Sequence, residues 1–172
     1  MPFIPVKQIP VFILLLLSAV SSRAQATPYA AALHAIGWLQ GKEAPGRIID
    51  VAGADTTYTA AEGFMPEGST CYFARDAGGA RGAAIIMRYP NAEMAEAEMG
   101  DIKAAALKIF PDLIAYPADT CTGGLGCKKR VLITPPGKER MAVSFEQAEF
   151  PEAPPQERFR LSTEFVIIPT TE

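Results

Sequence analysis

The feature that most constrains this chain is its N-terminus, where residues 1–26 have the pattern of a secretory signal peptide. Lys7 supplies a positive charge, and an apolar run over residues 11–17 continues past Ser18 to Val20. Ala24-Gln25-Ala26 provides the small residues at which a signal peptidase cuts. A membrane-spanning helix needs about 20 apolar residues, so the run is too short for a retained anchor. We therefore expect cleavage after Ala26 and a periplasmic or secreted protein.

Cleavage sets the size and charge of the mature protein. Removal of 26 of the 172 residues leaves 146, so we expect a single domain over residues 27–172. The leader holds Lys7 and Arg23, two of the 16 basic residues, so 14 basic and 19 acidic side chains remain, a net charge of −5 with His34 neutral. Mild acidity argues against a nucleic-acid-binding protein, which needs a clustered basic surface. The one basic cluster, residues 128–130, is interpreted as the solvated start of a strand; contact with an anion or a lipid headgroup is the alternative.

The three cysteines fit an oxidising compartment, where disulfides persist. The favoured pair is Cys121 with Cys127, because three glycines between them ease a tight loop. Cys71 then remains as a free thiol in a strand. A long-range bridge from Cys71 to either of the other two is the alternative, and sequence alone does not choose between them. A metal site is not expected, because three cysteines and one histidine lack the spacing of a zinc finger.

Hydrophobic periodicity and turn residues predict two helices and a series of short strands. The helices are expected at 28–40 and 92–110. The strands are expected at 47–51, 56–60, 70–75, 82–89, 113–116, 129–134, 141–146 and 158–168. The inward stripe of the second helix is predicted to consist of Ala95, Met99, Ile102, Ala106 and Ile109.

Most of these strands are joined by short turns, which favours antiparallel pairing. The fold class expected is therefore α+β, with a mainly antiparallel sheet covered on one face by a long helix and a short N-terminal helix in addition. After removal of the leader, no segment is apolar enough to span a membrane.

No set of residues in the sequence forms a catalytic, cofactor or metal motif. His34, the only histidine, is interpreted as a surface or packed structural residue. Glu93, Glu96 and Glu98 are interpreted as a solvated helix face. Cys71 is a candidate nucleophile only if nearby cations or a helix N-terminus lower its pKa.

We therefore expect a non-catalytic binding or accessory module of the cell envelope, with a protein or lipid as partner, rather than an enzyme. A small envelope hydrolase using carboxylates or Cys71 is the alternative. A third possibility is an assembly module that pairs through an exposed strand edge, for which residues 158–168 are the candidate.

Overall fold

A computed structural model describes residues 26–61, 63–117, 121, 125–135 and 140–168. The predicted signal peptide lies outside these residues except for Ala26. The elements, in chain order, are α2 (Pro28–Leu39), β1 (Ile48–Ala52), β2 (Asp55–Thr59), β3 (Thr70–Arg75), β4 (Arg81–Tyr89), α3 (Ala92–Ile109), β5 (Ile114–Tyr116), β6 (Leu125–Ile133), β7 (Arg140–Glu149), the 3-10 turn η1 (Pro155–Glu157) and β8 (Phe159–Ile168).

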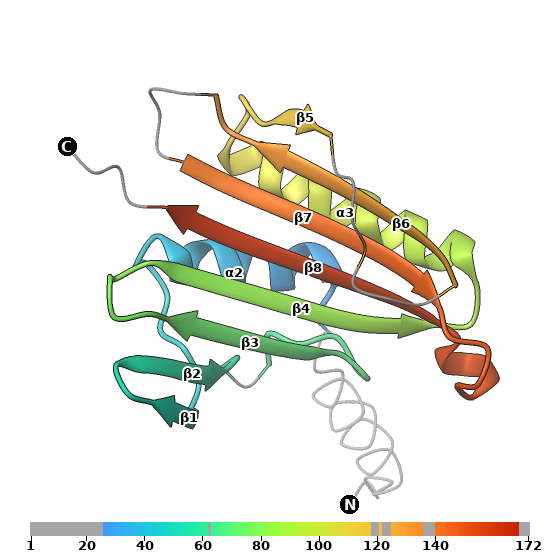
Figure 1. Ribbon diagram of the computed structural model, residues 1–172, viewed down its shortest axis with the longest axis horizontal. Helices are drawn as coiled ribbons and strands as arrows, with labels where there is room; N and C mark the ends of the chain where they lie inside the picture. Colours follow the sequence, from blue (N-terminus) through green and yellow to red (C-terminus); the bar gives the residue numbers. More distant parts are fainter. Residues whose placement is uncertain (1–25, 62, 118–120, 122–124, 136–139, 169–172) are drawn as a thin grey trace, which may run out of the picture.

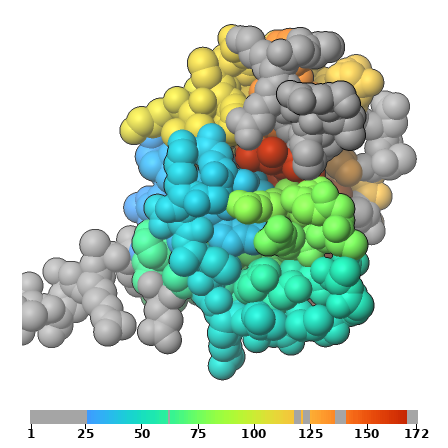
Figure 2. Space-filling view, turned by 90° about the vertical axis from the view of Figure 1, so that its left-hand side faces the viewer, coloured from blue at the N-terminus to red at the C-terminus, as the bar shows by residue number. Residues whose placement is uncertain are grey.

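The strands form one antiparallel sheet in the order β1-β2-β3-β4-β8-β7-β6-β5. Both helices pack against the same face of this sheet, behind it in Figure 1. The α+β fold class expected from the sequence is therefore confirmed. The β1–β2 hairpin lies at one end of the molecule, beside the turn between β3 and β4 (Figure 2).

Local sequence explains where α2 begins and ends. The Thr27 hydroxyl oxygen accepts a hydrogen bond from the Ala30 N–H at 3.1 Å, and Pro28 occupies the first helical position. Gly41, at φ +72°, takes the left-handed conformation that ends a helix, and its N–H donates to the Trp38 carbonyl. Seven of the twelve residues of α2 are buried, because this helix packs against both α3 and the sheet.

Helix α3 begins at the Asn91 cap, whose side-chain oxygen accepts from the Met94 N–H at 2.9 Å. Its predicted inward stripe is correct at four of five positions. The prediction for Ile109 is wrong: this last residue of the helix is 39% exposed. Ala105, which lies outside the predicted stripe, is also buried, because α2 covers a second side of α3.

Two predictions about the strands are also wrong. Strand β8 pairs with both β4 and β7, so residues 158–168 form the centre of the sheet and offer no free edge. The edges are β1 and β5. Residues 128–130 lie inside β6 rather than at its start, because β6 pairs with β7 from Leu125 onward.

The core fills the space between the helices and the sheet. Alternate residues of the central strands point into it, as the pleat requires. Its largest fully buried side chains include Phe73, Ile85, Phe145, Leu161 and Phe165. Among the described residues, no helix is long and apolar enough to cross a membrane.

Candidate binding groove and neighbouring polar sites

The structure buries both Cys71, the candidate nucleophile, and His34, the only histidine of the sequence. Cys71 is a free thiol, 6% exposed, on the helix-covered face of β3, and burial raises its pKa to about 12. His34 is 5% exposed and stacks on Phe64 with ring centroids 4.0 Å apart. Burial lowers the pKa of His34, and the charge of Glu43 partly opposes this shift. His34 is thus a packed residue, as expected, and the Cys71 thiol is held in its unreactive form.

The helix glutamates do not share one environment. Glu96 is exposed and forms an ion pair with Arg130 of β6 at 2.7 Å. Glu98 is half-buried, and one of its oxygens has no hydrogen-bond partner among the described residues. Burial raises the pKa of Glu98, and the charge of Asp101 adds to this shift. The prediction of a uniformly solvated glutamate face is therefore wrong, because Glu98 turns toward the neighbouring elements of the fold.

A groove with a volume of about 190 Å³ lies on the covered side, between α3 and strands β6 and β7. Its lining residues are Glu96, Met99, Gly100, Lys103, Arg130, Leu132 and Phe145. Met99, Leu132 and Phe145 form an apolar base continuous with the core. The charged residues stand at its rim. We name this opening the α3 groove.

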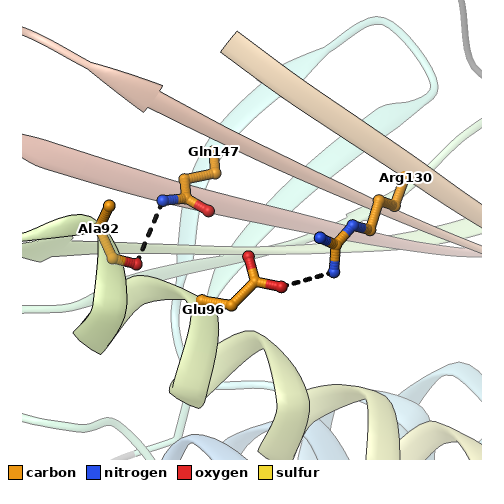
Figure 3. A network of polar contacts seen from close by, with 4 residues as sticks. All are labelled: Ala92, Glu96, Arg130 and Gln147. Atoms are coloured by element: carbon orange, nitrogen blue, oxygen red, sulfur yellow. Dashed lines mark hydrogen bonds and ion pairs between the residues drawn. The ribbon is translucent and has the colours of Figure 1, made fainter. Parts of the chain in front are cut away.

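Two polar contacts between α3 and the sheet frame the groove (Figure 3). The Arg130 guanidinium donates to the Glu96 carboxylate at 2.7 Å, and the Gln147 side-chain amide donates to the Ala92 carbonyl at 3.3 Å. The second contact holds the first turn of α3 against β7. Both contacts join the N-terminal half of α3 to the sheet, and Glu96 and Arg130 themselves line the groove.

Gly100 lines the groove and contributes no side chain to it. It lies in the middle of α3, where glycine costs roughly 1 kcal/mol relative to alanine. A Cβ built at this position meets no atom within 4 Å, so packing within the chain does not require glycine here. The absence of a side chain leaves room in the groove, and the glycine makes the helix less stable than alanine would.

The groove carries charges of both signs, and among the described residues one of its cations has no partner. Arg130 is paired with Glu96, whereas no described residue forms an ion pair or hydrogen bond with Lys103. Lys128 precedes Arg130 by two residues, so it lies on the same side of β6, and its side chain is exposed. An apolar base with cations at its rim fits a small ligand that has an apolar part and an anionic group.

A second opening, of about 230 Å³, lies on the opposite face of the sheet. A row of paired residues crosses it from β6 to β4: Lys129, Glu146, Ser162 and Ile86. Glu146 is only 6% exposed, and Arg160 lies 3.7 Å from it as its ion-pair partner. Cys121 and Cys127 adjoin Glu146 and are at disulfide distance, with Cα atoms 6.2 Å apart, which is the pairing favoured by the sequence.

No known family model, curated protein or solved structure matches this chain. The function must therefore be argued from the site itself. The α3 groove was not predicted from the sequence, because its lining residues are far apart along the chain; Glu96 and Arg130 are separated by 34 positions. A glycine inside an otherwise strong helix was the one available signal.

Proposed function

We propose that this protein is an exported, non-catalytic binding module that holds a small anionic amphiphile of the cell envelope in the α3 groove. The observation that carries the proposal is the lining of the α3 groove, an apolar base beside charged side chains, with Gly100, an unfavourable helix residue, at its edge. The signal-like leader and the disulfide-distance cysteine pair are in keeping with export.

The chemistry of the ligand follows from the lining. Met99, Leu132 and Phe145 offer an apolar surface on which a short acyl chain loses contact with water. Lys103 offers an ammonium group without a protein partner among the described residues, and this group suits a carboxylate or a phosphate. Drug-sized ligands occupy pockets of roughly 300–1,000 Å³, so a groove of about 190 Å³ suits a smaller occupant.

The test uses sodium octanoate as a probe, measured by isothermal titration calorimetry with octan-1-ol as its uncharged counterpart. We expect saturable binding of octanoate to the wild-type protein. Gly100→Leu fills the groove, so its affinity should fall at least about tenfold, or about 1.4 kcal/mol. Gly100→Ala is the matched control. It should keep its affinity while raising the free energy of unfolding by about 1 kcal/mol, because it removes the helix penalty of glycine.

Lys103→Gln separates the charged from the apolar part of the site. It should weaken octanoate binding several-fold and leave octan-1-ol binding unchanged. Octanoate binding to Gly100→Leu with wild-type affinity, or no saturable binding to the wild-type protein, would refute the proposal.

A further inference from the structure

Three metal-ligating side chains meet on the open face of the sheet, away from the α3 groove. The two sulfur atoms of Cys121 and Cys127 and a carboxylate oxygen of Glu146 all lie within 4.8 Å of one another. They come from separate parts of the chain: Cys127 and Glu146 from β6 and β7, and Cys121 from the segment that precedes β6. In the oxidised protein the two sulfurs are joined and are not metal ligands.

We propose that reduction of the Cys121–Cys127 pair creates a site for a zinc-like divalent cation, with two thiolates and the Glu146 carboxylate as ligands. Zinc binds cysteine sulfur at about 2.3 Å and carboxylate oxygen at about 2.0–2.2 Å. Ligand atoms within 4.8 Å of one another can therefore reach a common ion after small movements. Three protein ligands leave the fourth tetrahedral position to water.

The position of Glu146 supports this assignment. It is 6% exposed, although it belongs to the face of the sheet that no helix covers. A carboxylate withdrawn from water and placed against two sulfurs is a better cation ligand than one on an open surface, because less water competes for it. Its ion-pair partner Arg160 holds the side chain in place at 3.7 Å.

Lys129 and Arg160 line the same opening as Glu146. Two thiolates and one carboxylate carry three negative charges. A divalent cation offsets two of these charges, and the positive side chains of Lys129 and Arg160 help to offset the third.

The reductant is a dithiol. Each of its two thiols gives up a hydrogen, the dithiol becomes a disulfide, and the Cys121–Cys127 bond opens to two thiols. Binding of the cation then releases the two thiol protons. In an oxidising envelope the pair stays joined and the site stays closed, so the cation binds only where reducing equivalents are supplied.

The experiment uses the purified protein reduced with a trialkylphosphine, which takes an oxygen from water as the two thiols form. Excess phosphine is removed without air, and Co²⁺ is titrated as an optical substitute for Zn²⁺. We expect thiolate-to-cobalt charge-transfer absorbance that saturates at one ion per chain and disappears when Zn²⁺ is added. The oxidised protein and the reduced Cys121→Ser variant should show no such absorbance.

Glu146→Gln tests the third ligand, and its affinity for Co²⁺ should fall at least about tenfold. Cys71→Ala is the matched control and should bind as the wild type does, because Cys71 is buried on the other face. Wild-type affinity in Glu146→Gln, or equal spectra for oxidised and reduced protein, would overturn the proposal.

Cys71 also reports whether the reduced protein stays folded. In the folded state only two thiols should react with a thiol reagent, since Cys71 is 6% exposed. If a third thiol reacts, reduction has loosened the fold, and Zn²⁺ is then expected to restore protection of Cys71. Failure of Zn²⁺ to do so would also count against the site.

Discussion

The two faces of the sheet are formed by the same strands but differ in burial and polarity. On the covered face, Phe73, Ile85 and Phe165 are fully buried under α2 and α3. On the open face, the row that includes Lys129, Glu146 and Ser162 is polar and charged. Successive residues of a strand point to opposite faces, so one strand contributes to both environments. The comparison indicates that stability depends mainly on the covered face, so that substitutions on the open face should change it less.

The largest expected effect compares two adjacent residues of β4. Ile85 is fully buried on the covered face, whereas Ile86 is partly exposed in the opening on the other face. Ile85→Ala leaves a cavity in the core and should lower the free energy of unfolding by about 2–5 kcal/mol. Ile86→Ala should lower it by less than about 1.5 kcal/mol, because water already reaches that side chain. Urea denaturation of both variants measures the difference, and equal losses would contradict the division between the faces.

A smaller effect is expected from the disulfide-distance pair. The Cys121→Ser/Cys127→Ser variant frees a loop with a sequence separation of only 6 residues. Loop entropy for so short a ring amounts to about 2 kcal/mol, so the thermal midpoint should fall while the fold is kept. Circular dichroism and reactivity of Cys71 measure both outcomes. Unfolding of this variant at room temperature would mean that the open face contributes more to stability than the comparison allows.

The smallest expected effect concerns His34, a titratable group on the covered side. Its pKa is lowered from 6.5 by burial, and Glu43 partly opposes the shift. The folded state then binds a proton less readily than the unfolded state. The stability contributed by neutral His34 is complete above pH 6.5 and is lost as the pH falls from there toward the folded-state pKa.

His34→Gln should remove this dependence. The difference in the free energy of unfolding between wild type and His34→Gln, followed from about pH 8 to about pH 5.5, isolates the contribution of the histidine from those of the carboxylates. A wild-type curve that rises toward acidic pH relative to the variant would show that the attraction of Glu43 outweighs burial.

Local sequence was enough to locate both helices and the general course of the strands. Thr27-Pro28 and Asn91 mark helix starts, and Gly41 marks an end, because capping depends on neighbouring residues alone. The short turns between strands predicted the antiparallel α+β class, because a turn also depends on neighbouring residues. Strand ends were less accurate: β6 and β7 extend beyond the predicted bounds, since pairing between them continues where local preference does not require it.

Contacts between distant segments were decided only by the tertiary structure. Short-range patterns cannot say which strand is central, so residues 158–168 were mistaken for an edge although β8 lies between β4 and β7. The α3 groove needs α3 to lie across β6 and β7, and the cluster at Glu146 needs β7 to bring a carboxylate to the cysteine pair. The sequence thus determined local structure and cysteine spacing, whereas packing determined which side chains meet, because that depends on the order of strands in the sheet.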